Sequence, residues 1–372
     1  MPNRYYRPSG DRDEYVGVLG GGAFGSAMAF LLARKGFKVR IWARESEVVE
    51  AINTKHENVP FFPGVQLPET VEAVSEVTQA AKETNPTIVL LAIPTPFLRS
   101  FVVANREAFP VKVPIVCLSK GIENESLCLP LEILLEELPG KYHKFLSAVS
   151  GPSFAKEIAQ GKPTSVSCAA YEKAVAEQVQ QMLSDSRFRL YTTQDCLGVE
   201  LCGAVKNVLA IASGACDRLG YGDVGRAALI TRGLAEISRL ACKKGASPLT
   251  MMGLAGVGDL VLTCSGSLSR NFQVGRRLAG GETLEQIVSS VSSVAEGVAT
   301  AKSVMAMASK LGVDMPICKA VHDVLYQGRK IADALEDLVS RPLKEEVDQA
   351  VMDHLGAHHG HPTGGDGHHQ SW

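Results

Sequence analysis

Short apolar runs alternate with amphipathic stretches over the first half of the chain, from Tyr15 to about Thr193. Most of these runs are continuously apolar, which is typical of strands that helices cover on both faces. Their alternation with helical stretches, and the glycines that follow the strands, predict an α/β fold with a doubly wound, mainly parallel sheet. The runs expected to form strands are residues 15–20, 38–43, 87–94, 114–121, 145–151, 164–170 and 188–193.

The pattern changes after Asp195, where long amphipathic or apolar stretches follow one another with no convincing strand between them. We therefore expect an α/β domain over residues 15–193 and an all-helical domain over residues 194–343. A chain of 372 residues is also too long for one comfortable core. The expected helices of the second domain lie at residues 198–219, 225–245, 271–281, 298–312 and 316–328.

The two ends of the chain differ from both domains. Residues 1–14 are polar with mixed charge and are expected to form a flexible arm, not a secretory signal. Residues 344–372 are expected to be a disordered tail, in which six of the nine histidines crowd into the last nineteen residues. Few histidines remain for the folded body, so we do not expect the chemistry to depend on one, and we predict no metal site.

Charge and composition narrow the class of protein. The formal net charge is −2 and no basic run appears, which argues against a nucleic-acid partner. No apolar run approaches the roughly 20 residues of a membrane-spanning helix, and Ile88–Ile93, for example, is only as long as a strand. Nine cysteines without a C-x-x-C pair indicate buried reduced thiols. These features predict a cytoplasmic protein that binds neither nucleic acid nor a membrane.

A glycine-rich loop follows the first expected strand. Gly20, Gly22 and Gly25 have G-x-G-x-x-G spacing, a helical stretch follows them, and the next expected strand comes at the usual distance. In a Rossmann-type domain these glycines allow a tight turn, a close approach of the backbone to a pyrophosphate, and close helix–strand packing. We therefore predict a dinucleotide site. A plain glycine turn is the alternative.

The sequence leaves the choice between NAD and NADP open. An acidic residue at the end of the second strand would bind the ribose 2′-hydroxyl of NAD. This chain has Ala43 and Arg44 there, followed by Glu45. Arg44 could accept a 2′-phosphate or could simply lie over the adenine.

Two lysines occur where charge is unexpected. Lys206 lies in an apolar helical stretch without an obvious polar stripe, and burial would lower the pKa of its amine toward the range useful for proton transfer. Lys120 ends an apolar strand, at the edge of the sheet where ligands collect. If both face one pocket, each lowers the pKa of the other and a phosphate would relieve their repulsion. The alternatives are a lysine reaching solvent at the domain boundary and a solvated strand-end lysine.

A third candidate lies in the sequence GLAGVGDLVLTCSGSLSRN. Ser269 has the features of a helix N-cap, so Arg270 would sit at the positive end of that helix, where a cation is unfavourable unless an anion is present. Arg270, Asn271 and free N–H groups could hold a phosphate. Asp259 and Thr263 are four residues apart and would share a face if that stretch is helical. The alternative is a capped surface helix.

These motifs together resemble the NAD(P)-dependent glycerol-3-phosphate dehydrogenases, from residue 15 to about 340. ELCGAVKN together with GDLVLTC and SRN is highly specific, whereas the glycine loop by itself is not. The other stretches that carry the resemblance are CLSKGIE, SGPSFAKEIA, RAALITRGLAE and AEGVAT. The resemblance implies a Rossmann domain joined to a helical domain similar to that of 6-phosphogluconate dehydrogenase, in a homodimer.

The resemblance also implies roles for individual residues. Lys206 would be the proton donor and acceptor on the substrate oxygen, with Lys120 beside it in contact with substrate and cofactor, and Arg270 would be the principal phosphate ligand. Asn207, Asp259 and Thr263 would position the substrate and order Lys206. Further substrate contacts are implied for Gly151, Ser153, Ser269 and Asn271. Further cofactor contacts are implied for Ala23, Phe24, Ala155 and Glu296.

The expected reaction is the reversible reduction of dihydroxyacetone phosphate to sn-glycerol 3-phosphate with NADH or NADPH. Two alternatives stay open. One is a hydroxyacid dehydrogenase of the same architecture that acts on a carboxylate, and the other is a dinucleotide sensor without turnover. The shortage of histidines disfavours the lactate and malate type, and a sensor needs no proton donor.

Overall fold

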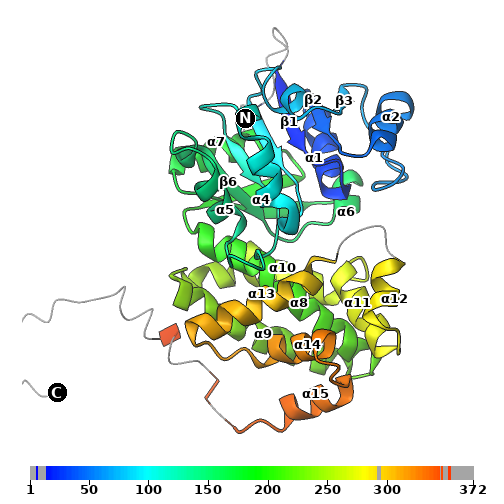
Figure 1. The fold of residues 1–372 in the computed structure, drawn as a ribbon, viewed down its shortest axis with the longest axis vertical. Coiled ribbons are helices and arrows are strands. Elements are labelled where there is room, and N and C mark those ends of the chain that lie inside the picture. The colour runs from blue at the N-terminus through cyan, green and yellow to red at the C-terminus, as the bar shows by residue number, and fades with distance from the viewer. Residues whose placement is uncertain (1–5, 7–13, 291–294, 344, 347–350, 353–372) are drawn as a thin grey trace, which may run out of the picture.

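The computed structural model describes residues 6, 14–290, 295–343, 345–346 and 351–352. The expected N-terminal arm, residues 1–14, and the expected tail, residues 344–372, lie almost entirely outside the described residues. An α/β domain and a helical domain stack along the long axis of the molecule (Figure 1). Helices α10 and α13 lie on the side of the helical domain that faces the sheet (Figure 1).

Eight strands form one sheet in the order β3-β2-β1-β4-β5-β6-β7-β8. All neighbouring strands are parallel except β6 and β7, which pair in antiparallel fashion. The strands are β1 (Tyr15–Leu19), β2 (Lys38–Trp42), β3 (Val71–Val74), β4 (Ile88–Leu91), β5 (Ile115–Cys117), β6 (Leu146–Ser150), β7 (Thr164–Ala170) and β8 (Phe188–Thr193). The helices of this domain are α1 (Ala23–Arg34), α2 (Ser46–Lys55), α3 (Val77–Ala81), α4 (Thr95–Ala104), α5 (Pro130–Glu137), α6 (Ala155–Ala159) and α7 (Lys173–Leu183).

The central strands are continuously apolar because both faces of the sheet are covered. In β4, Ile88 and Leu90 belong to one core cluster, whereas Val89 and Leu91 belong to the cluster on the opposite face. Successive side chains of a strand point to opposite faces, so a strand buried on both sides needs an apolar residue at every position. The seven expected strands and the doubly wound α/β fold are confirmed.

Two features of the sheet differ from the sequence expectation. Strand β3 was not predicted, because it is four residues long, carries Glu72 on an exposed position, and pairs with β2 alone at the edge of the sheet. The reversal between β6 and β7 was not predicted either. Nothing in the apolar pattern of a strand encodes its direction, which depends on the path of the connecting chain.

The helical domain is built around α8 (Cys196–Arg218), which follows β8 directly. Helices α9, α10, α11 and α13 all pack against α8. The crossing of α8 and α11 is very close, since a Cβ on Gly214 would lie 1.9 Å from the carbonyl oxygen of Phe272 and a Cβ on Gly275 would lie 1.9 Å from that of Ile211. The other helices are α9 (Gly222–Lys244), α10 (Asp259–Ser265), α11 (Arg270–Ala279), α12 (Leu284–Ser289), α13 (Glu296–Leu311), α14 (Pro316–Tyr326) and α15 (Ile331–Val339). The five helices expected from the sequence are confirmed, and α10, α12 and α15 are additional.

Helix α8 is long and apolar enough to cross a membrane by length and composition, which was not expected from the sequence. However, 89% of its apolar window is buried inside the protein, as is usual for the core helix of a globular domain. All nine cysteines are free, and all but Cys128 are buried, in line with the expected burial of the thiols.

A buried carboxylate from α8 connects the two domains. Glu200 is 5% exposed, and its Oε1 accepts a 2.8 Å hydrogen bond from the backbone N–H of Leu131, in the first turn of α5. Burial is the largest influence on this carboxyl group and raises its pKa to about 8. Nearby, Lys244 of α9 donates a 2.6 Å hydrogen bond to Glu132 of α5. The N-terminal end of α5 is therefore fixed to the helical domain.

The raised pKa makes the stability of the protein depend on pH. Between about pH 4.5 and 8 the folded chain retains a proton on Glu200 that the unfolded chain has lost, so stability falls as pH rises through this range. Replacing Glu200 with Gln removes that dependence. We expect the melting temperature of Glu200→Gln to fall less than that of the parent between pH 5.5 and 8.5, by about 2 °C or more. The exposed Glu69→Gln variant is the control, and a variant that follows the parent at every pH would contradict the assignment.

Candidate active site

The glycine loop between β1 and α1 has the geometry of a phosphate-binding turn. Gly20 has a φ of +125°, and a Cβ there would lie 2.5 Å from the carbonyl oxygen of Ala92. A Cβ on Gly25 would lie 2.0 Å from the carbonyl oxygen of Gly20, so this position packs the helix against the strand. By contrast, a Cβ on Gly22, the N-cap of α1, would meet no atom within 4 Å. The open space at the start of a helix suits a pyrophosphate, which free N–H groups and the helix dipole would stabilise.

Asn58 holds this loop in place and was not identified from the sequence. It is fully buried, and its Nδ2 donates hydrogen bonds to the carbonyl oxygen of Gly21 at 2.7 Å and to Ser26 Oγ at 2.8 Å. A single asparagine in a loop carries no motif, so only the folded chain reveals this contact.

Arg44 lies just after β2, at the carboxyl edge of the sheet, and its side chain is 75% exposed. Its guanidinium pairs with the carboxylate of Glu45 at 2.7 Å. The arginine is therefore accessible to a ligand, but the geometry leaves the choice between a 2′-phosphate and an adenine ring open.

Lys206 lies on the side of α8 that faces the sheet domain. The residue is 6% exposed, and its Nζ donates to the carboxylate of Asp259 and, at 2.9 Å, to Thr263 Oγ1. A Cβ on Gly203, one turn earlier in α8, would lie 2.8 Å from Ser150 Oγ and 3.6 Å from the methylene carbons of Lys120. The glycine therefore allows the close approach of Ser150 to α8, and the stem of Lys120 passes beside the helix at the same point.

Asp259 joins the two lysines. Its Oδ1 accepts from Lys206, and its Oδ2 accepts a 2.9 Å hydrogen bond from Lys120 Nζ. Asp259 and Thr263 share one face of α10, as expected, and Thr263 Oγ1 also donates to the backbone oxygen of Asp259 at 2.6 Å. A π-helical turn, Leu254–Gly258, directly precedes Asp259, the first residue of α10.

Burial and charge act against each other in this cluster. Burial is the largest influence on Lys206 and, with the nearby ammonium of Lys120, lowers the pKa of Lys206 to about 8 although Asp259 raises it. Burial alone would raise the pKa of Asp259, but the two ammonium groups outweigh it and lower that pKa. The expected repulsion between the lysines is thus relieved by a carboxylate between them. Two ammonium groups and one carboxylate leave the cluster with a formal surplus of one positive charge when Lys206 is protonated.

The start of α11 forms the side of the site next to this cluster. Ser269 Oγ caps the helix by accepting from the N–H of Phe272 at 3.2 Å, as expected, and Arg270 is exposed in the first turn. Asn271 Oδ1 accepts a 2.9 Å hydrogen bond from the N–H of Gly297, which fixes α11 to the start of α13.

Glu296, the first residue of α13, lies among the cationic groups. Asn207 Nδ2 donates to its carboxylate at 3.5 Å. Burial raises the pKa of Glu296, while the positive charges of Lys120, Lys206 and Arg270 act in the opposite direction. Glu296 and these three cationic groups therefore interact electrostatically at the junction of the domains.

The segment after β6 lies beside the lysines. Lys120 Nζ donates to the carbonyl oxygen of Gly151 at 3.4 Å, and Ser153 Oγ donates to the same oxygen at 3.0 Å. Ala155 begins α6 and packs with Ala23 and Phe24 against the core cluster that contains β1. The substrate-contact and cofactor-contact candidates of this segment are consequently adjacent to one another.

The structure thus brings together Lys120, Lys206, Asp259 and Thr263 in direct contact. Around them it places Gly151, Ser153, Asn207, Ser269, Arg270, Asn271 and Glu296. Arg44 pairs with its neighbour Glu45 and does not take part in this set of contacts. A tunable amine next to a surplus of positive charge can transfer a proton to an oxygen atom of an anionic ligand.

Comparison with known proteins identifies the family. A family model described as the NAD-dependent glycerol-3-phosphate dehydrogenase N-terminus matches residues 15–176, and the model of the C-terminus of the same family matches residues 195–336. Among curated relatives, the glycerol-3-phosphate dehydrogenase [NAD(P)+] of Anaeromyxobacter sp. (strain K) is 47% identical over 330 residues, which cover 89% of this chain and 99% of the relative. The same enzyme of Bacillus cereus (strain G9842) is 42% identical over 340 residues, covering 91% and 99%.

A solved structure agrees with these matches. The crystal structure of glycerol-3-phosphate dehydrogenase from Coxiella burnetii is 35% identical, covers 88% of this chain and 99% of its own, and superposes with a TM-score of 0.83. The agreement of family models, relatives and fold confirms the resemblance, and with it an NAD(P)-dependent dehydrogenase with a Rossmann domain. The chain belongs to the NAD-dependent glycerol-3-phosphate dehydrogenase family.

Proposed function

We propose that this chain catalyses the reversible reduction of dihydroxyacetone phosphate to sn-glycerol 3-phosphate with NADH or NADPH. The observation that supports this most directly is the carboxylate of Asp259, which holds Lys206 and Lys120 side by side at the domain junction. The relatives carry the same activity in their names.

In this proposal Lys206 is the acid and base of the reaction. Its ammonium donates a proton to the oxygen on C2 of the substrate as the ketone becomes an alcohol. When bound, the nicotinamide cofactor supplies the hydride that C2 receives. In the reverse direction the neutral amine of Lys206 takes the proton back from the hydroxyl group. Asp259 and Thr263 orient the amine, since both bind it directly.

The other cationic groups hold the anionic substrate. Lys120 stabilises the charge that develops on the substrate oxygen. Arg270, in the exposed first turn of α11, binds the phosphate together with Asn271 and free N–H groups, which fixes the distance between C2 and the cofactor. Gly151, Ser153 and Asn207 line the same junction and complete the substrate contacts.

Cofactor contacts follow from the loop geometry. Gly20, Gly22 and Gly25 place the pyrophosphate at the start of α1, with Ala23, Phe24, Ala155 and Glu296 as further contacts and Arg44 toward the adenosine end. We also propose a homodimer in the cytoplasm. The family resemblance implies the homodimer, and the cysteines without a C-x-x-C pair favour the cytoplasm.

Replacing Lys206 with Met tests the assignment of the acid. We expect kcat for dihydroxyacetone phosphate reduction to fall by about 10²-fold or more, because general acid catalysis typically contributes 10²–10⁴-fold, with NADH binding retained. Steady-state rates and NADH fluorescence titrations measure the two effects.

An active Lys206→Met enzyme would contradict the assignment of Lys206 as the acid. Turnover of 2-keto acids in place of dihydroxyacetone phosphate would favour the hydroxyacid alternative, and cofactor binding without any turnover by the parent would favour a sensor.

The lowered pKa of Lys206 predicts opposite pH dependences for the two directions. Reduction needs the ammonium, so its kcat/KM should fall as pH rises through about 8. Oxidation needs the neutral amine, so its kcat/KM should rise through the same range. The pH profiles of kcat/KM in both directions, measured at saturating cofactor, check these opposite trends. A kcat/KM for reduction that stays level well above pH 9 would contradict the prediction.

Two alanine variants separate the roles of the loop glycines. Gly22→Ala should keep the melting temperature but raise the Kd for NADH about tenfold, equivalent to about 1.4 kcal/mol, because the new methyl group occupies the open space at the helix start. Gly25→Ala should lower the melting temperature, because its methyl group would overlap the carbonyl oxygen of Gly20. Gly140→Ala also adds a methyl group in open space and serves as the control. Unchanged NADH affinity in Gly22→Ala would contradict the proposed contact.

A further inference from the structure

The segment that carries Lys120, residues 118–129 between β5 and α5, has no helix or strand of its own. It contains one tight turn, in which the N–H of Leu127 donates to the carbonyl oxygen of Glu123 at 3.1 Å and the N–H of Glu123 donates to that of Cys128 at 2.9 Å. The position of Lys120 therefore depends on contacts between this β5–α5 segment and its surroundings.

The helical domain holds one side of the β5–α5 segment. Ile122 and Leu129 are buried in the core cluster of that domain, and Ser303 Oγ of α13 donates to the carbonyl oxygen of Ile122 at 2.9 Å. Lys120 itself reaches across to Asp259. These contacts fix this side of the β5–α5 segment to the helical domain.

Helix α4 of the Rossmann domain holds the other side at two residues one turn apart. Thr95 lies under Gly121, since a Cβ on this glycine would lie 2.8 Å from Thr95 Oγ1. Arg99, four residues later on the same face, donates from Nε to both oxygens of Glu123, at 3.0 and 2.9 Å. Gly121 and Glu123 are the first and third residues after Lys120, so α4 fixes the backbone immediately after the lysine.

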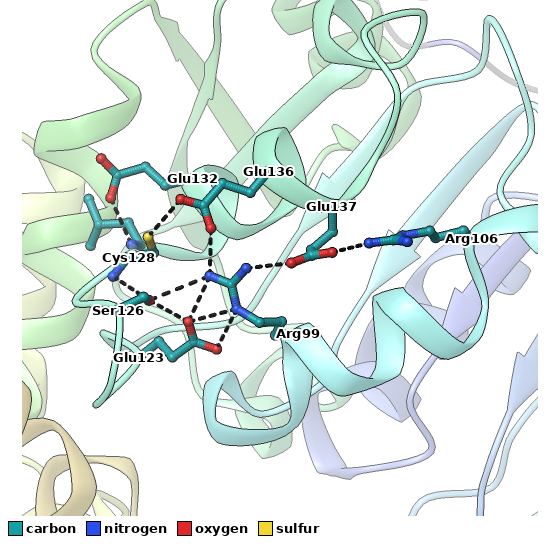
Figure 2. Close-up of polar contacts among 9 residues, drawn as sticks. Arg99, Arg106, Glu123, Ser126, Cys128, Glu132, Glu136 and Glu137 are labelled. Atoms are coloured by element: carbon teal, nitrogen blue, oxygen red, sulfur yellow. Dashed lines mark hydrogen bonds and ion pairs between the residues drawn. The ribbon is translucent and has the colours of Figure 1, made fainter.

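Arg99 is the centre of a larger ionic network (Figure 2). Its guanidinium also pairs with Glu136 at 2.7 Å and with Glu137 at 2.5 Å, both on α5. Glu137 in turn pairs with Arg106, at the end of the network away from the segment (Figure 2). Exposed single ion pairs contribute little, but a planar guanidinium bound by several carboxylates has a fixed geometry.

The carboxylate of Glu123 is partly buried and is held by two donors, Arg99 and Ser126. Its side chain is only 14% exposed, and Ser126 Oγ donates to it in addition to Arg99. Burial by itself would raise the pKa of Glu123, but the hydrogen bonds from Arg99 and Ser126 outweigh this and lower it. The pair therefore stays ionised throughout the neutral range.

We propose that Arg99 and Glu123 are positioning residues for the reaction, which hold Lys120 in register with Asp259 and Lys206 across the domain junction. The inference rests on the proposed function of Lys120. It assigns a catalytic consequence to an ionic network that contacts neither the glycine loop nor the lysine cluster directly.

The matched pair Glu123→Gln and Glu136→Gln tests the proposal. Each change removes one carboxylate charge that pairs with the guanidinium of Arg99, but only Glu123 belongs to the segment that carries Lys120. We expect kcat/KM for dihydroxyacetone phosphate to fall about tenfold in Glu123→Gln, since small misplacements of catalytic groups have effects of this size or larger. Glu136→Gln should stay within about twofold of the parent, and the Kd for NADH should be similar in both. Equal effects on kcat/KM would overturn the proposal.

The pH profile of reduction is a second readout, which a merely structural role would not move. The charged groups that face Lys206 are Asp259 of α10, Lys120 of the segment and Glu296 of α13. After burial, which is the largest cause, Lys120 also lowers the pKa of Lys206. Displacement of Lys120 should therefore move the falling limb of kcat/KM to higher pH in Glu123→Gln but not in Glu136→Gln. Superimposable limbs would count against the proposal.

A chemical readout keeps this proposal separate from the proposed function. Lys120 should react faster with acetic anhydride in Glu123→Gln than in Glu136→Gln, as measured by peptide mass spectrometry under native conditions. If the parent does not reduce dihydroxyacetone phosphate, the proposed function fails while this comparison still reports the position of Lys120. Should Glu123→Gln fail to fold, Arg99→Lys with Arg106→Lys as its control replaces the pair, because lysine keeps the charge but not the planar fork. Identical acetylation rates in the pair would refute the positioning role.

Discussion

The carboxylate of Asp259 is the interaction on which the arrangement of the site depends. It is buried, and it binds one ammonium group from each domain. A buried charge is costly unless it is paired, and removing one partner of such a group typically costs about 3–5 kcal/mol. The carboxylate therefore needs its lysine partners, and its two ion pairs connect the two domains at the junction where substrate is proposed to bind.

The packing of the helical domain explains how a lysine can be held there. Helix α8 is the most enclosed helix of the domain, and glycines at its crossing with α11 bring the two backbones into contact. This close packing leaves little freedom for α8. Lys206 consequently projects from a rigid element, and burial lowers the pKa of its amine while Asp259 keeps it oriented. Rigidity and a tuned pKa are the two properties that a proton donor needs.

Lys120 is held differently, because it comes from an irregular segment and not from a helix. Its position depends on two sets of contacts made by the residues that follow it. Ile122 contacts the helical domain, and Gly121 and Glu123 contact α4. Glu200 and Lys244 fix α5 to the helical domain at the far end of the same segment. The junction is thus crossed by several polar contacts, and the proposed substrate site lies among them, where the two lysines meet.

The sequence by itself determined seven of the strands, five helices of the second domain, the glycine loop and the N-cap at Ser269, and it placed Asp259 and Thr263 at helical spacing. All of these depend on residues that are close in the chain, whose periodicity and backbone preferences are local properties. It also marked Lys206 and Lys120 as unusual, because charge in an apolar stretch is visible in one dimension. The family resemblance added the roles of these residues.

Only the tertiary structure decided which distant groups meet. The short edge strand β3, the reversed strand β7, the pairing of both lysines with one carboxylate, and the contacts of Asn58, Glu200 and Arg99 were not predicted. Each of these depends on residues that the chain brings together from separate elements. Local pattern carries no information about such pairs, because the free energy that selects them arises from burial and charge in the assembled fold.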